Sequence, residues 1–266
     1  MAVKENISKI QQAMLRFFFL ALGVVLLLGA WETGHRLYGE LVLPGVFETA
    51  QMFVHMVGEG RVWPALVLTA GNASSGWIVG VGVGLVAGGF AGLREGVRLT
   101  LQPIFIIFLG IPAIAWIVLA LLWFGGHWAV VFTVAVATGP IIYGATVQGV
   151  RSLDRDLASM ARAFRAPLSA MVLDVYGPHL LNHLFPALAA TLAMSWKVSV
   201  MAELLTGSGG IGDGLATARA RVDSAEIMAW IVVVVCVLVL VDRLMLNPLQ
   251  RRLEMWRDDD GKVTMS

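Results

Sequence analysis

Long apolar segments recur along almost the whole chain, and they constrain its fold more than any other feature. A helix that crosses a lipid bilayer needs roughly 17–25 mostly apolar residues. Six segments meet this requirement, at about 14–31, 66–91, 101–124, 128–150, 184–205 and 227–246. Because they leave no room for a separate soluble domain, the sequence predicts one all-α membrane domain over residues 1–266, with about six transmembrane helices.

The composition agrees with this prediction. Hydrophobic residues make up 58% of the chain and charged residues only 14%, which is far less charge than a soluble surface carries. The net charge of +1 gives no indication of nucleic-acid binding, and none is expected. The single cysteine, Cys236, excludes a disulfide framework, and no metal site is expected because His179 and His183 lack a nearby third ligand.

The distribution of lysine and arginine predicts the orientation of the helices. If the N-terminus is cytoplasmic, fourteen of the 19 Lys and Arg residues fall in cytoplasmic segments and four in outer loops. This imbalance is typical of the positive-inside rule. The first apolar segment follows Lys4, Lys9 and Arg16 and is longer than that of a signal peptide, which predicts an uncleaved anchor. We therefore expect a multi-pass protein of a bacterial inner (plasma) membrane with both termini in the cytoplasm.

Glycines recur at every fourth position of the second segment. Such a repeat lies nearly on one helix face and lets another backbone approach closely, which is how helices pack in lipid. The repeat predicts either a static packing face or a face that slides as the protein moves. Its members are Gly76, Gly80, Gly84, Gly88 and Gly92.

The segment 151–182, between the fourth and fifth spans, predicts two short helices at the membrane surface. Apolar residues in its first half follow the spacing of one helical stripe, with Arg155 and Arg162 on other faces. Pro167 ends this helix, and a second short one is predicted over 168–176. The element is either a surface connector or a docking site for a cytoplasmic partner. The stripe consists of Leu157, Met160, Ala161 and Phe164.

The fifth span contains Lys197 in its interior. An intramembrane lysine costs about 2.5–3.5 kcal/mol on insertion scales and almost always faces water or a partner. It therefore either lines the path of an anionic substrate or pairs with a carboxylate of another helix. Glu203 lies near the outer end of the span, where a carboxylate is better tolerated, and is expected to hold the next loop or to form part of a gate.

The run Gly207-Ser-Gly-Gly-Ile-Gly212 matches a GxGxxG pattern but follows a membrane helix rather than a strand. We therefore reject it as a nucleotide site. A P-loop motif, GxxxxGK[ST], is also absent from the chain. The chain is not expected to bind or hydrolyse ATP by that route.

Several short motifs resemble one family through their order and spacing. Met160-Ala161-Arg162 is followed by Pro178, with Trp196 18 residues and Glu203 25 residues after that proline. Together with the matches below, they resemble the permease subunits of ATP-binding-cassette importers, in the group that handles nitrate, taurine, alkanesulfonates and bicarbonate. Ser159 and Arg165 depart from the pattern, which has glutamate and glycine there. The other matches are Leu43-Pro44, Ile111-Pro112, Ala115-Trp116, Leu122-Trp-Phe-Gly125, Gly209-Gly-Ile-Gly212 and Trp256.

The resemblance implies a type I importer-like fold with a cytoplasmic coupling loop at 151–182. It further implies two partner ATPase subunits that bind ATP and Mg²⁺, so this chain needs no cofactor and is not an enzyme. A second permease subunit, expected to be an identical copy, and a periplasmic or lipid-anchored binding protein complete the transporter. ATPase docking is assigned to Arg155, Leu157, Met160, Ala161, Arg162 and Phe164, and the substrate path to Trp196, Lys197 and Glu203.

Two other functions also fit the sequence. One is a stand-alone secondary transporter that uses Lys197 and Glu203 as coupling residues. The other is a membrane scaffold whose segment 151–182 recruits a cytoplasmic partner. The sequence favours the importer permease, for a small anionic or organic solute.

Overall fold

The computed structural model of the chain describes residues 2–152, 177–241 and 243, and this part contains helices and no strand. The all-α prediction is confirmed. The helices are α1 (Ala2–Tyr38), α2 (Val46–Gly58), α3 (Val62–Leu93), α4 (Glu95–Gly110), α5 (Ala113–Trp123), α6 (Gly126–Arg151), α9 (Gly177–Thr206), α10 (Gly210–Ala220) and α11 (Ser224–Val241).

Five of the described helices are long and apolar enough to cross a membrane, and they correspond to five of the six predicted spans. The end of the sixth predicted span lies outside the described residues. The protein is therefore a multi-pass membrane protein. The five spans are Phe18–Tyr38, Val62–Leu93, Gly126–Arg151, His183–Thr206 and Ser224–Val241.

The predicted third span is not one continuous helix. Its two parts, α4 and α5, meet at an angle of 99°. Pro112 disfavours the helical conformation of the residue before it, and Ile111 is accordingly extended, with φ −79° and ψ 126°. The prediction of an unbroken span over 101–124 was wrong because hydropathy does not register this break.

Helix α9 begins earlier than predicted. The sequence predicts a loop over residues 151–182, but the helix already starts at Gly177. Pro178 is compatible with this start because the first turn of a helix does not need the backbone N–H that proline lacks. The fifth span thus continues into a longer helix.

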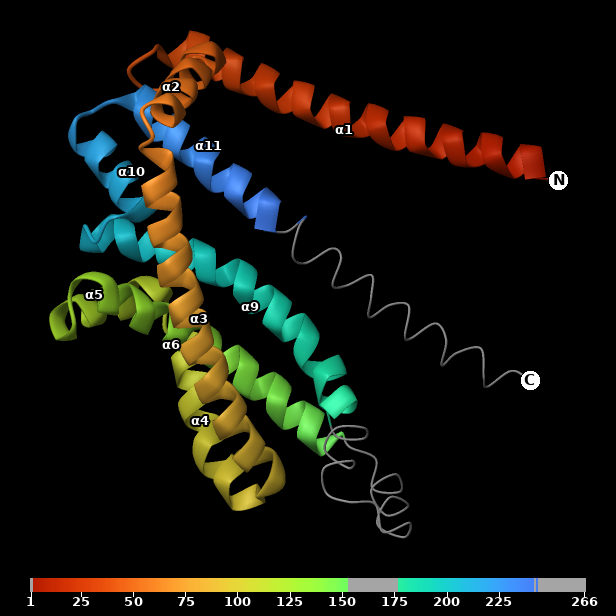
Figure 1. The fold of residues 1–266 in the computed structure, drawn as a ribbon, viewed down its shortest axis with the longest axis vertical. Coiled ribbons are helices and arrows are strands. Elements are labelled where there is room, and N and C mark those ends of the chain that lie inside the picture. Colours follow the sequence, from red (N-terminus) through yellow and green to blue (C-terminus); the bar gives the residue numbers. More distant parts are fainter. Residues whose placement is uncertain (1, 153–176, 242, 244–266) are drawn as a thin grey trace.

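Helix α3 lies at the centre of the bundle (Figure 1) and packs against α6, α9, α10 and α4. Two groups of buried apolar side chains surround it. One joins α2, α10 and α11 around Met56, Ile211 and Trp230, and the other joins α5, α6 and α9 around Ile117 and Val134. One end of the bundle is built by α2, α10 and the start of α11 and is called the α10 end here. The opposite end, where α4 and α9 begin and α6 ends at Arg151, is called the Arg151 end.

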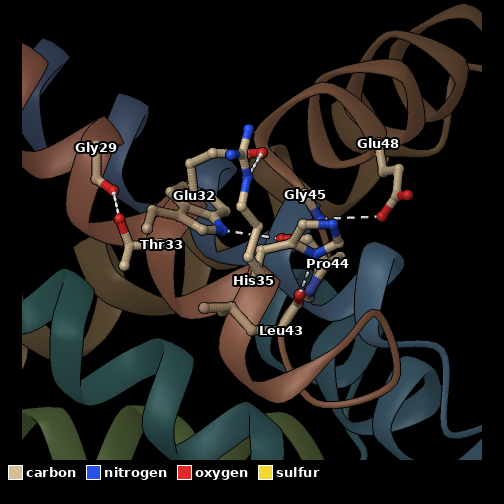
Figure 2. Close-up of polar contacts among 10 residues, drawn as sticks. Gly29, Glu32, Thr33, His35, Leu43, Pro44, Gly45 and Glu48 are labelled. Atoms are coloured by element: carbon tan, nitrogen blue, oxygen red, sulfur yellow. Dashed lines mark hydrogen bonds and ion pairs between the residues drawn. The ribbon is translucent and has the colours of Figure 1, made fainter.

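Helix α1 extends away from the bundle (Figure 1), and none of its most apolar window is buried within the chain. Its direction is fixed at the corner where it meets α2, shown in Figure 2. Trp31 Nε1 donates to the carbonyl of Pro44 at 2.9 Å, and His35 Nδ1 lies 2.7 Å from the carbonyl of Leu43. The remaining surface of α1 is available to lipid or to another membrane helix.

Candidate functional site

The six predicted docking residues Arg155, Leu157, Met160, Ala161, Arg162 and Phe164 lie outside the described residues. The two helices that flank their segment, α6 and α9, pack closely against each other. Gly149 of α6 is buried, and a Cβ atom there would lie 2.8 Å from Leu180 Cδ1 and 3.2 Å from His183 Cβ of α9. A displacement of one helix at this end must therefore also move the other.

The glycine repeat lies where α3 crosses α6. Gly76, Gly80, Gly84 and Gly88 are all buried. A Cβ atom on Gly84 would lie 2.8 Å from the carbonyl oxygen of Gly139, which is closer than real Cβ atoms approach. The repeat thus lets two backbones approach one another, as expected for a packing face, and the structure itself gives no sign of sliding.

Glu203 is the best-partnered polar group in the described part of the bundle. Its side chain is 0% exposed and its carboxylate accepts four hydrogen bonds. Thr69 and Asn72 of α3 donate to it at 2.8 and 2.7 Å, Ser199 of α9 at 3.3 Å, and the backbone N–H of Gly212 in α10 at 3.2 Å. These five residues, called the Glu203 cluster here, connect three helices.

Two further contacts extend the Glu203 cluster. The backbone N–H of Ile211 donates to Thr69 Oγ1 at 2.9 Å, so this hydroxyl links α10 to the carboxylate. His127, at the start of α6, contacts Asn72 Oδ1 through Nδ1. The sequence predicts that Glu203 holds the next loop or forms part of a gate. In the structure its carboxylate accepts the Gly212 N–H of α10, so it contacts the segment beyond that loop, and the gate role stays a prediction.

The glycine-rich run after α9 forms a tight turn. Gly207, Gly209 and Gly210 all have positive φ angles, between 60° and 85°, which side-chain-bearing residues rarely adopt. A Cβ atom on Gly210 would lie 2.5 Å from Glu203 Oε2. The run therefore serves to fold α10 back onto α9 and over Glu203.

Lys197 and Trp196 lie on different sides of α9. Trp196 is partly buried against the apolar group around Met56, Ile211 and Trp230. Lys197 is exposed on the surface of the single chain. Within the described residues, no hydrogen bond or ion pair of Lys197 is formed, so a carboxylate partner on another described helix is not found. Within the described residues, neither forms a hydrogen bond or ion pair with Glu203, and a shared path of the three residues stays a prediction.

An ion pair fastens the α10 end of the bundle. Arg61, just before α3, lies 2.6 Å from the carboxylate of Glu226 in the first turn of α11, and it also contacts Glu59 at 2.7 Å. Burial alone would lower the pKa of Arg61, but the hydrogen bonds and charges of Glu226 and Glu59 raise it. Because Glu226 is nearly buried, this pair ties the α2–α3 connection to the last span.

Sequence reasoning missed the partners of Glu203. Thr69 and Asn72 are three positions apart, which places them on the same face of a helix, and each would be costly in lipid without a partner. That pattern could have identified them as polar contacts of α3, although not their partner on α9. The part of the chain that the structure describes contains no group of three His, Cys, Asp or Glu side chains suited to a metal ion.

The chain is similar in sequence to known membrane components of transport systems. The sequence model of the "Binding-protein-dependent transport system inner membrane component" family matches residues 80–254. The Bacillus subtilis (strain 168) protein SsuC, named as an aliphatic sulfonates transport permease, is 26% identical over 87% of this chain and 85% of its own. The Escherichia coli (strain K12) taurine transport system permease TauC is 24% identical over 90% of each chain.

The fold is also similar to that of a solved transporter. A chain from the inward-facing MetNI methionine ABC transporter superposes with a TM-score of 0.56 at 20% identity, covering 71% of this chain and 93% of that chain. At this identity, the similarity concerns the fold. The helical bundle therefore has the fold of a type I importer permease.

Proposed function

Since the chain belongs to the family of binding-protein-dependent transport system inner membrane components, we propose that it pairs with an identical copy and forms the path of an ATP-driven importer. The main support for this proposal is the family match, which covers residues 80–254, from the middle of α3 onwards. The chain is the permease subunit of an ABC transporter, and ATP hydrolysis belongs to a separate subunit.

We propose that two ATPase subunits dock on the segment 151–182 and that a periplasmic or lipid-anchored binding protein delivers the solute at the α10 end. This assignment puts both termini in the cytoplasm, in keeping with the excess of Lys and Arg on that side. Affinity purification of the tagged chain should recover an ATPase subunit. A complex that never contains one, together with uptake that survives ATP depletion, would refute the proposal.

We propose a small organic or inorganic anion as the solute, because Lys197 is a cation within a span and has no partner among the residues that the structure describes. A charged side chain facing lipid is unfavourable, which argues for a path or an interface between subunits at this surface. The relatives support an anionic group on the solute, since TauC is named for taurine, a zwitterion that carries a sulfonate, and CmpB, which is 29% identical over 58% of this chain and 56% of its own, is named for bicarbonate.

The proposed role of Lys197 predicts the effect of removing its charge. Lys197→Met should lower the rate of anion uptake at least about tenfold with little change in folded yield, because a charge-assisted contact of about 1.5–3 kcal/mol is lost. Lys197→Arg, which keeps the charge, should retain most of the uptake. Both variants are measured as labelled taurine uptake per folded transporter. Normal uptake by Lys197→Met would argue against a path role.

The docking proposal makes a separate prediction. Leu157→Asp places a charge on the predicted apolar stripe and should abolish uptake while the chain still inserts and purifies normally, because a desolvated carboxylate in an apolar groove is costly. Asp156→Ala, on a neighbouring face of the same predicted helix, is the control and should transport normally. Uptake and ATP hydrolysis are measured together. Full uptake by Leu157→Asp would exclude docking through this stripe.

The stand-alone secondary transporter receives less support from the geometry. It requires Lys197 and Glu203 to act together, yet Glu203 is enclosed by hydrogen-bond donors and Lys197 faces out of the chain. A carboxylate already engaged with four donors is a poor coupling site. An ATP-independent uptake driven by an ion gradient would nevertheless favour that mechanism.

A further inference from the structure

A cavity of about 680 Å³ lies between α4, α6 and the first turns of α9, at the Arg151 end of the bundle. This volume falls within the range of sites for small ligands. Its apolar lining residues include Phe105, Ile106, Leu109 and Pro140. The polar residues of the wall include Arg98, Gln102, Tyr143, Gln148 and Arg151.

Two buried hydrogen-bonding atoms of this wall have no partner. Tyr143 is only 5% exposed, and its hydroxyl makes no hydrogen bond. The Nε atom of Arg98 is likewise buried without a partner. Since buried polar atoms are almost always hydrogen-bonded, two orphaned groups on one cavity indicate a missing acceptor.

The charge of the cavity wall indicates the chemistry of that acceptor. Arg98 and Arg151 both line the cavity, whereas none of its described lining residues is Asp or Glu. The two terminal nitrogens of Arg98 donate to Gln102 at 3.2 Å and to Glu95 at 2.9 Å, which leaves Nε free. The Glu95 carboxylate is 73% exposed, and such surface pairs contribute little. Within the described residues, Arg151 forms no hydrogen bond or ion pair. Two cations sharing a cavity repel each other unless an anion lies between them.

We propose that this cavity binds a small oxyanion group, such as a sulfonate, phosphate or carboxylate. The guanidinium groups of Arg98 and Arg151 and the hydroxyl of Tyr143 hold its oxygen atoms, because guanidinium groups match the geometry of oxyanions. The ring of Tyr143 stacks on Phe105 with centroids 4.0 Å apart, which fixes the position of the hydroxyl. The apolar lining residues accommodate the carbon-containing part of the same molecule.

Two sources can supply this oxyanion, a free solute or the headgroup of an anionic lipid. The site is tested without ATP or transport, so its failure leaves the proposed import function standing. Binding of labelled sulfate to the purified transporter complex in uncharged detergent is measured for the wild type and for Arg98→Gln, Arg151→Gln and Tyr143→Phe. Arg94→Gln, at the same end of α4 but not lining the cavity, is the matched control.

The wild type and Arg94→Gln should bind sulfate saturably. Arg98→Gln and Arg151→Gln should each weaken binding about tenfold or more, and Tyr143→Phe by a smaller factor, provided that thermal unfolding shows them folded. Repeating the measurement in nanodiscs of phosphatidylcholine with and without phosphatidylglycerol identifies the source. Competition by phosphatidylglycerol indicates a lipid headgroup, and its absence a free anion. Absence of saturable binding, or equal affinity in wild type and all three cavity variants, would overturn the proposal.

Discussion

Replacing Gly84 with alanine is expected to destabilise the bundle by about 1–3 kcal/mol, the usual cost of inserting a methyl group into a well-packed interface. The new Cβ atom would lie 2.8 Å from both the Gly139 carbonyl oxygen and Ile142 Cβ, and a backbone atom cannot turn aside as a flexible side chain can. Gly84→Leu should prevent the correct packing of α3 on α6 altogether. The measurement is the thermal unfolding midpoint and the yield of monodisperse protein in detergent.

Gly82 supplies the matched control. It lies two positions away on the same helix, and a Cβ atom there would meet nothing within 4 Å. Gly82→Ala should leave the midpoint unchanged or raise it slightly, because alanine is the better helix former. If Gly84→Ala and Gly82→Ala unfold at the same temperature, the glycine face does not set the packing of α3 against α6.

Replacing Glu203 with leucine is expected to have an even larger effect. Thr69, Asn72, Ser199 and the Gly212 N–H would all lose their acceptor in a buried site, and each unsatisfied buried donor costs about 1–3 kcal/mol. Because folded proteins have a total stability of about 5–15 kcal/mol, we expect little folded Glu203→Leu protein. The yield after size-exclusion chromatography is the direct measurement.

Glu203→Gln and Glu32→Gln separate the role of the cluster from that of charge. The amide has the same size as the carboxylate but brings an NH₂ group towards donors, so it should destabilise by an intermediate amount. Glu32 is 41% exposed and pairs only with Arg36 at 3.4 Å, so its replacement should cost less than about 1 kcal/mol. A Glu203→Leu protein as stable as Glu32→Gln would contradict the geometry of the cluster.

Hydropathy and charge predicted the helices because a bilayer imposes length and polarity on every spanning segment. The same reasoning missed the break at Ile111-Pro112, because both halves of the segment are apolar and only the backbone preference of a single residue differs. It also started α9 too late, since Gly177-Pro178 ends or begins a helix equally well in a sequence. Whether a proline or glycine starts, ends or breaks a helix depends on the tertiary packing around it.

The candidate site was less predictable than the fold. A glycine repeat has a direct geometric meaning, and the sequence anticipated a close-packed face on α3. Glu203, by contrast, looked like a tolerated carboxylate near a membrane surface, because its environment comes from Thr69 and Asn72, more than 130 positions away. Hydrogen bonds between residues far apart in the sequence produce no periodic pattern in either segment. For the same reason, the cavity lined by Arg98 and Tyr143 could not be predicted from the sequence.

Uptake by the reconstituted transporter shows whether the chain is the permease of an ATP-driven importer. The chain is co-purified with its ATPase subunit, placed in liposomes, and supplied with its binding protein and labelled taurine or methanesulfonate on one side and ATP on the other. We expect accumulation against the solute gradient that requires ATP, the ATPase subunit and the binding protein together. Accumulation that proceeds without ATP or the ATPase subunit, driven by an ion gradient across the same liposomes, would contradict it.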